Sequence, residues 1–156
     1  MTLRTNYFEL APKAVEILMS QESYLAEQFS TSGTVTTLTW ELVKLRVSQI
    51  NQCAFCIDMH SKDLLNRGES LERIMGLAAW QDMPLYSETE RLALGLAERL
   101  TTGKSVDDSF YKTVVQVLGE KEVVDITIAT NAINSWNRIA KTFKPEVGSY
   151  KPQSVV

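Results

Sequence analysis

Apolar residues recur at helical spacing along most of the chain. Positions three or four residues apart share one face of a helix, and Leu, Ile, Val and Ala repeatedly follow that spacing. The helices predicted in this way cover about residues 12–28, 38–51, 53–66, 71–78, 88–102, 108–118 and 120–143. No segment has the sustained apolar–polar alternation that is typical of strands. The pattern therefore predicts an all-α fold, a compact domain of about six to eight helices.

Residues that begin and end helices support these boundaries. Pro12 suits a first helical turn, where the N–H that proline lacks has no intrahelical partner. Ser87 and Glu90 have the spacing of a capping box. Gly103 and Gly119 directly follow two of the predicted helices, which is where glycine commonly ends a helix.

The chain contains no repeat, low-complexity segment or linker that would divide it. Its 156 residues are enough for a single domain with a hydrophobic core. We expect that domain to span residues 1–156, with its core in about residues 7–143 and an extended tail over residues 144–156. The first ten residues are predicted to be irregular, with three apolar anchors: Tyr7, Phe8 and Leu10.

The helix predicted over residues 120–143 is apolar on more than one face. Such a helix has to bury both faces, so we expect it to contact its own core and another subunit of a homo-oligomer. Asn131, Asn134 and Asn137 recur every three residues along it. They could line a site, form caps or make hydrogen bonds between helices.

Composition and charge exclude several classes of protein. Hydrophobic residues make up 44% of the chain and charged residues 22%, which is ordinary for a globular protein. The net charge is −3 and no basic face stands out, so we expect no nucleic-acid partner. No apolar run approaches the roughly 20 residues that span a bilayer. Glu9, Lys13 and Glu16 interrupt the apolar residues near the N-terminus, unlike a signal peptide, so we expect a cytoplasmic protein without membrane contact.

The stretch from Glu41 to His60 contains both cysteines, Cys53 and Cys56, and the only histidine of the chain. Two residues between two cysteines is the spacing of a redox dithiol or of half a metal site. Cys53, Cys56 and His60 lie at i, i+3 and i+7, so a single helix places them on one face. We therefore expect the chemistry of the protein in this stretch.

Glu41 can join this cluster only if the chain reverses between two helices. In one continuous helix, the segment from Glu41 to the first cysteine would span about 18 Å and end on a different face. Asn51 tolerates the left-handed conformation that ends helices, so we expect a reversal at Asn51 and Gln52. The reversal would bring His60 and Cys56 toward Glu41.

A dithiol at a helix N-terminus is activated by its position. The helix dipole and the free N–H groups lower a cysteine pKa from its usual value of about 8.5. His60, one turn after Cys56, can accept a proton, and Glu41 can orient His60. This combination indicates thiol–disulfide or thiol–peroxide chemistry, in which one cysteine attacks and the other resolves. The spacing leaves the order open, because Cys53 lies nearer the helix end and Cys56 nearer His60.

Other roles fit the same residues. The two cysteines could be inert buried thiols, or they could bind zinc together with His60 and with Glu41 or water. His60 alone could be a hydrogen-bonded core residue. Glu41 could be a solvated acid paired with Lys44 or Arg46, an arrangement that contributes little stability.

The order of these residues resembles a known motif. Glu41, eleven residues, Cys53, two residues, Cys56, three residues and His60 is similar to the motif of the AhpD-like alkylhydroperoxidases, members of the carboxymuconolactone decarboxylase superfamily. Further stretches resemble the small cytoplasmic members: LVKLRVSQIN, CIDMHSKDL, LAAW, SETERLALGLAE and INSWNRIA. The resemblance covers about residues 7–143.

The resemblance implies an all-α fold that assembles into trimers or hexamers. It also implies a peroxidase or disulfide-reductase role in antioxidant defence. By the matching positions, Cys56 would be the peroxidatic cysteine and Cys53 the resolving one. Glu41 and His60 would form the relay that deprotonates Cys56.

Two positions depart from the family pattern. Phe55 stands where the best-known alkylhydroperoxidases of the family carry a second histidine, so a proton path through that residue is absent. Gln52 stands where many relatives have a glycine after Asn51, so the reversal has to form without the conformational freedom of glycine. Neither departure removes the dithiol.

We therefore expect an enzyme, an antioxidant thiol-dependent (alkyl)hydroperoxide reductase that uses the dithiol with a Glu/His proton relay. It needs no metal or organic cofactor, but it needs a thiol reductant or a dithiol protein such as a peroxiredoxin. The alternatives are a disulfide reductase that serves a separate peroxiredoxin, a non-enzymatic redox sensor and a zinc-binding oligomer. Decarboxylation of a muconolactone is disfavoured, because a redox dithiol has no evident task in that reaction.

Overall fold

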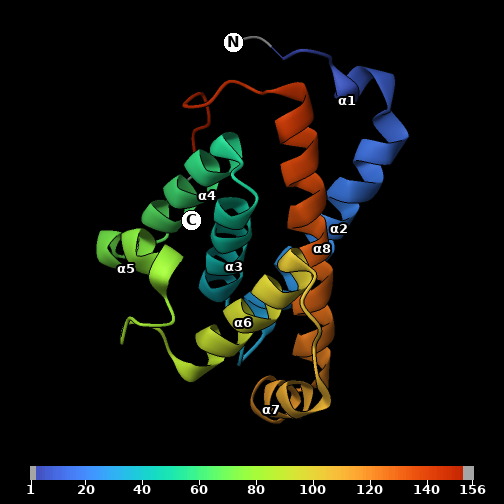
Figure 1. Ribbon diagram of the computed structural model, residues 1–156. Coiled ribbons are helices and arrows are strands. Elements are labelled where there is room, and N and C mark those ends of the chain that lie inside the picture. The colour runs from blue at the N-terminus through green and yellow to red at the C-terminus, as the bar shows by residue number, and fades with distance from the viewer. Residues whose placement is uncertain (1–2, 153–156) are drawn as a thin grey trace.

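The computed structural model describes residues 3–152 and is built from helices joined by short connections (Figure 1). The elements are α1 (Tyr7–Leu10), α2 (Pro12–Thr31), α3 (Thr37–Ile50), α4 (Ala54–Asn66), α5 (Leu71–Gly76), the 3₁₀ helix η1 (Leu77–Ala79), α6 (Glu88–Thr102), α7 (Asp108–Leu118) and α8 (Glu120–Phe143). Residues 3–152 contain no strand. The prediction of an all-α fold is confirmed, and the eight α-helices of this described part of the chain lie within the expected range. None of these helices is long and apolar enough to cross a membrane.

Helix α3 lies at the centre of the fold and packs against α4, α6 and α8 (Figure 1). Nine of its residues are buried, including Leu42, Val43 and Val47 of the hydrophobic core. The buried set also contains Glu41 and Lys44. Buried charges are costly unless they are paired, so this central helix requires charged partners within the core.

The chain reverses between α3 and α4, as the sequence predicts. Asn51 is the C-cap of α3 and keeps right-handed helical backbone angles. The left-handed residue is Gln52, with φ of 54°, one position after the residue expected to adopt that conformation. The Cys53 N–H then donates to the Ser48 carbonyl over 3.0 Å, which closes the turn. A glutamine therefore makes the turn for which glycine is better suited.

Three of the predicted helix starts are confirmed by side-chain hydrogen bonds. Ser87 and Glu90 form both bonds of the capping box at the start of α6. The Ser70 hydroxyl accepts from the Arg73 N–H at the start of α5. Asp107 caps α7 by accepting from the backbone N–H of Phe110.

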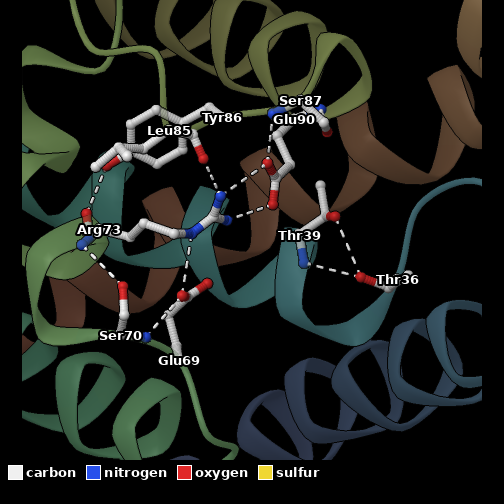
Figure 2. Close-up of polar contacts among 9 residues, drawn as sticks. All are labelled: Thr36, Thr39, Glu69, Ser70, Arg73, Leu85, Tyr86, Ser87 and Glu90. Atoms are coloured by element: carbon white, nitrogen blue, oxygen red, sulfur yellow. Dashed lines mark hydrogen bonds and ion pairs between the residues drawn. The ribbon is translucent and has the colours of Figure 1, made fainter.

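Arg73 ties α5 to the segment that leads into α6 (Figure 2). Its Nε donates to Glu69 over 3.0 Å, and its guanidinium also contacts Glu90 and the Leu85 carbonyl. The hydroxyl of Tyr86 donates to the Arg73 carbonyl over 2.5 Å. Glu69 and Glu90 thus both bind the guanidinium of Arg73, and the planar shape of that group fixes the directions of its N–H donors. None of these contacts involves the cysteines.

The N-terminal region differs from the prediction. Residues 7–10, expected to be irregular, form the short helix α1. Tyr7 does anchor this region, with its ring 5.2 Å from that of Phe143. Phe8 and Leu10 do not, because they are 51% and 76% exposed. All three residues were predicted to be anchors because they are apolar. A single turn of helix points its side chains in different directions, so only some of them can contact the core.

The chain that follows α8 turns toward α4 and lies along it (Figure 1). Lys62 of α4 donates to the carbonyls of Gly148 and Tyr150 over 3.3 and 3.2 Å. Asp58 accepts from the Gly148 N–H over 3.2 Å. The hydroxyl of Tyr150 donates to Asp63 over 2.7 Å. The C-terminal segment is therefore held on the helix that carries Cys56 and His60, and residues 153–156 of the predicted tail lie outside the described residues.

We expect Gln52→Gly to raise the free energy of unfolding by roughly 0.5–1 kcal/mol, because glycine adopts a positive φ without the steric cost that glutamine has there. Gln116→Gly is the matched control. Gln116 is exposed within α7, and the same substitution there should lower the free energy of unfolding by about 1 kcal/mol. Urea unfolding followed by circular dichroism measures both, and equal destabilisation by the two variants would contradict the strain assigned to Gln52.

Candidate active site

Cys53 and Cys56 lie at the N-terminal end of α4. Cys53 is the N-cap and Cys56 lies in the first turn, so the helix begins at the first cysteine as predicted. The two form a disulfide with their Cα atoms 5.3 Å apart. Both are buried, with exposed fractions of 1% and 2%. The structure thus represents the oxidised state of the pair.

His60 lies one turn beyond Cys56 on the same helix and is 3% exposed. Its Nδ1 is 3.1 Å from Oε2 of Glu41, so the reversal after α3 brings these two residues together as expected. A carboxylate only accepts hydrogen bonds, which assigns the proton of a neutral imidazole to Nδ1. Nε2 is then an acceptor, and it has no hydrogen-bond partner within residues 3–152. A buried histidine with one free acceptor nitrogen is suited to take a proton.

Lys44 completes the cluster on the other side of Glu41. Its Nζ is 2.6 Å from Oε1 of Glu41 and lies 3.6 Å from the centre of the Trp40 ring. Glu41 and Lys44 are both buried, so the alternative of a solvated ion pair is wrong. Lys44 is nevertheless one of the two partners that this alternative named for Glu41. Sequence reasoning did not place Lys44 in the site. The i, i+3 spacing signals the pair, but only the packing of the other helices buries it.

The environment of Glu41 favours its charged form. Burial alone raises the pKa of Glu41, but the Lys44 charge and the hydrogen bond from His60 outweigh it and lower the pKa to about 2. Glu41 is therefore an anion throughout the physiological range. An anion at this position holds the His60 ring in one orientation and stabilises a proton that the ring accepts.

Two further acids surround this cluster. Burial raises the pKa of Glu22 on α2, and Lys44 and His60 oppose that rise. Burial also raises the pKa of Asp63 on α4, and the hydrogen bond from Tyr150 opposes it. These groups take up protons more readily than exposed acids do, and they lie around the pair formed by Glu41 and His60.

A metal fits this arrangement poorly. Glu41, His60 and Asp63 place potential ligand atoms within 4.8 Å of one another. Lys44, however, already supplies a cation to Glu41, and a second cation there would be repelled. The sulfurs of Cys53 and Cys56 are bonded to each other and are not thiolate ligands in this state. A zinc site would therefore require the reduced protein.

Asparagine side chains hold the turn that precedes Cys53 against α8. The Asn51 side-chain amide donates to the side chains of Asn134 and Asn137, both over 2.9 Å. Asn137 in turn donates to the Ser48 hydroxyl over 3.0 Å. The Lys141 ammonium donates to the Asn51 carbonyl over 2.7 Å. Asn134 and Asn137 thus make hydrogen bonds between helices, which was one of the roles expected for them.

A small pocket of about 90 Å³ opens on one side of the disulfide. Residues of the turn, of the end of α8 and of the C-terminal segment line it: Gln52, Cys53, Ala54, Phe55, Ala140, Lys141, Lys144, Pro145 and Val147. Cys53 is in this lining and Cys56 is not. A larger pocket of about 320 Å³ lies along α6, reaches Phe110 of α7, and includes none of the predicted site residues.

We expect Lys44→Met to lower the free energy of unfolding by about 3 kcal/mol, because it leaves the Glu41 charge buried without its closest partner. The double variant Glu41→Gln, Lys44→Met removes both charges and should recover most of that loss. Urea unfolding of both single variants and the double variant gives the coupling energy. Strictly additive effects would show that the two side chains do not interact.

The stabilisation by Glu41 should also depend on pH. Its pKa in the folded protein is below its ordinary value of 4.5, so the stabilisation is complete above about pH 4.5 and is lost as the pH falls toward 2. The difference in unfolding free energy between the wild type and Glu41→Gln should therefore shrink over that range. A difference that stays constant there would contradict the assignment of Glu41 as a stabilised anion.

Sequence comparison identifies relatives over most of the chain. The model of the carboxymuconolactone decarboxylase family matches residues 19–99, which include the cysteines, the histidine and Glu41. The uncharacterized protein YdfG of Bacillus subtilis (strain 168) is 42% identical over 142 residues, which are 90% of this chain and 93% of YdfG.

Structural comparison agrees. A crystal structure of a protein of unknown function from Agrobacterium tumefaciens, a candidate AhpD antioxidant defence protein, has a TM-score of 0.81 and 35% identity, with 98% of this chain and 100% of that chain covered. The debrominase Bmp8 has a TM-score of 0.77 over 91% of this chain and 74% of its own, but 14% identity, so it shows the fold alone. These matches show that the chain belongs to the carboxymuconolactone decarboxylase family, as an AhpD-like member.

Proposed function

We propose that this protein is a thiol-dependent hydroperoxide reductase that works in antioxidant defence. The observation that carries the proposal is the buried pair of His60 and Glu41, one helical turn from a cysteine of a disulfide. Such a pair serves to move a proton to and from a thiol. An inert structural disulfide would have no need of a buried, ionised acid held by lysine and histidine.

In the oxidising half of the proposed cycle, Cys56 is the peroxidatic residue. His60 takes the thiol proton of Cys56 at Nε2, and Glu41 stabilises the imidazolium that results. The Cys56 thiolate attacks one peroxide oxygen, the O–O bond breaks, and Cys56 becomes a sulfenic acid. The proton from His60 passes to the departing alkoxide, which leaves as an alcohol.

The resolving step closes the disulfide that the structure contains. The Cys53 thiol attacks the Cys56 sulfur, the sulfur–oxygen bond breaks, and water leaves. The Cα atoms of the two residues are 5.3 Å apart, within the ordinary range for a disulfide, so the helix start permits this bond. A thiol reductant then has to open it, which fits a protein of the reducing cytoplasm.

The position of Cys56 favours its thiolate form. It lies in the first turn of α4, where the free N–H groups and the helix dipole stabilise negative charge. A neutral His60 adds an acceptor for the proton that leaves. No step of the proposed cycle needs a metal or an organic cofactor.

A second candidate function is a disulfide reductase that serves a separate peroxiredoxin. The observation in its favour is that Cys53, and not Cys56, lines the pocket beside the disulfide. A partner thiol could exchange with Cys53 there, whereas the pocket lining does not include Cys56, the residue proposed to react with peroxide. A non-enzymatic redox sensor or a zinc-binding oligomer would share the dithiol but show no turnover.

We also propose that the protein is a homo-oligomer, a trimer or a hexamer. Several large apolar side chains are exposed on α2 and α5, among them Ile17 at 70% and Met75 at 74%. Contact with further copies of the chain would cover these side chains and remove their apolar area from water.

We expect the reduced, metal-free protein to consume an organic hydroperoxide far faster than free cysteine does, with loss of two thiols per chain. Stopped-flow mixing with thiol counting measures this. Cys56→Ser should abolish the fast reaction, and Cys53→Ser should leave a sulfenic acid that dimedone traps at Cys56.

The same experiment separates the two candidate functions. Absence of fast peroxide consumption, followed by its appearance when a peroxiredoxin is added, would contradict direct peroxide reduction and support the disulfide reductase. Normal turnover by Cys56→Ser would show that the order of attack is wrong.

A further inference from the structure

The pocket beside the disulfide adjoins only one of its two cysteines, although both side chains are buried. Of the two cysteines, Cys53 is in its lining, and the rest of the wall comes from the turn, the end of α8 and the C-terminal segment. A thiolate attacks a disulfide at one sulfur and expels the other, so access decides which cysteine leaves. An external thiol in this pocket would therefore bond to Cys53 and release Cys56.

Cys56 is also the better leaving group. Thiols of low pKa leave a disulfide faster than thiols of high pKa. Both cysteines lie at the start of α4, but only Cys56 lies one turn before His60, which can stabilise its thiolate. Access and leaving-group chemistry thus favour the same direction of attack.

The charged side chains in the lining of this pocket are both lysines. Lys141 and Lys144 line it, and no acidic side chain does. The bond from Lys141 to the Asn51 carbonyl fixes that ammonium beside the turn. No ion pair within residues 3–152 engages either lysine. The C-terminus of α8 contributes about half a negative charge nearby, which two full positive charges outweigh.

The size of the pocket sets a further limit. Its volume of about 90 Å³ holds a few water molecules. Its other walls are largely apolar, from Ala54, Phe55, Ala140, Pro145 and Val147. The sulfur end of a slim, unbranched thiol fits such a space, and an acidic group on the same molecule would then lie near the lysine ammonium groups.

We propose that this pocket is the binding site of the reductant, a small thiol that carries a carboxylate, and that this thiol attacks Cys53. The inference deepens the proposed function and rests on it only in taking the Cys53–Cys56 disulfide to be reduced in each cycle. It assigns Lys141 and Lys144 as specificity-determining residues. Neither lysine is part of the relay formed by Glu41 and His60.

The reduction balances with two equivalents of thiol. The first thiolate bonds to the Cys53 sulfur, the disulfide breaks, and Cys56 leaves as a thiolate. A second thiolate attacks the sulfur of the bound thiol, which leaves Cys53 as a thiolate and releases the external disulfide. The two cysteine sulfurs gain two electrons, which the two external thiols lose. The Cys56 thiolate is the form that the proposed peroxide reaction uses next.

The test compares three small thiols that differ in their second functional group: thioglycolate carries an anionic carboxylate, mercaptoethanol a neutral hydroxyl and cysteamine a cationic ammonium. Stopped-flow mixing measures the rate constant with which each thiol reduces the oxidised protein, and this rate constant is divided by the fraction of the thiol that is present as thiolate. The rate of each thiol with neutral hydroxyethyl disulfide corrects for intrinsic reactivity. We expect thioglycolate to exceed cysteamine by about tenfold at low ionic strength, and the ratio to fall as salt screens the lysines.

The charge variant is Lys141→Gln, Lys144→Gln, which should bring the ratio close to one. Lys13→Gln, Lys112→Gln removes the same charge from exposed positions on α2 and α7 and should retain the ratio. Because Lys141 also supports the turn, Lys144→Gln alone provides a second variant, with an intermediate ratio expected. Equal rates for the three thiols with the wild type, or an unchanged ratio in both pocket variants, would overturn the proposal.

Acid quenching during reduction by thioglycolate identifies the attacked sulfur. Peptide mass spectrometry should find the thioglycolate adduct on Cys53, and an adduct on Cys56 would overturn the direction of attack. Failure here is distinguishable from failure of the proposed function. If the protein shows the charge preference but does not react with hydroperoxide, the reductant pocket is supported and the peroxidase function is contradicted. If it reacts with hydroperoxide but shows no charge preference, the peroxidase function is supported and the reductant pocket is contradicted.

Discussion

The buried carboxylate of Glu41 is the constraint on which the site depends. A charge in the core requires partners, and Glu41 obtains them from two helices: Lys44 on α3 and His60 on α4. The contact with His60 is possible only because the chain reverses at Gln52 and lays α4 along α3. The same reversal places the cysteines at a helix start. The reversal at Gln52 therefore accounts both for the contact between Glu41 and His60 and for the position of the dithiol at a helix start.

The remaining helices support this arrangement from outside. Helix α8 holds the turn through Asn134 and Asn137, and its last residues form a wall of the pocket beside Cys53. The C-terminal segment lies on α4 and adds Tyr150 to the surroundings of Asp63. The two sides of the disulfide therefore differ. Glu41 and His60 form a buried hydrogen-bonded pair, whereas Lys141 and Lys144 line the pocket at Cys53.

Much of the fold could be predicted because its signals are local. Apolar spacing located the long helices, and the Ser87–Glu90 capping box marked one start. The positions of Cys53, Cys56 and His60 on one helix followed from their spacing alone. The approach of Glu41 to His60 was also predictable once the turn was expected, since only a reversal makes that contact possible.

Other features could not be predicted because they depend on contacts between distant segments. The burial of Lys44 results from packing of helices around α3, and its own sequence neighbours do not indicate it. Likewise, nothing near Tyr150 indicates that its hydroxyl meets Asp63, and the exposure of Ile17 on α2 is a property of the assembled fold. The pocket at Cys53 combines three separate parts of the chain, so spacing could not show which cysteine lines it.

The proposed mechanism requires Glu41 and His60 to stabilise the thiolate of Cys56. The most direct test is a pH titration of the thiolate absorbance of Cys56 in the Cys53→Ser variant, repeated with His60→Gln added. We expect ionisation well below the value of about 8.5 that is usual for cysteine, and a higher midpoint when His60 is replaced. A midpoint at or above that usual value, unchanged by His60→Gln, would contradict it.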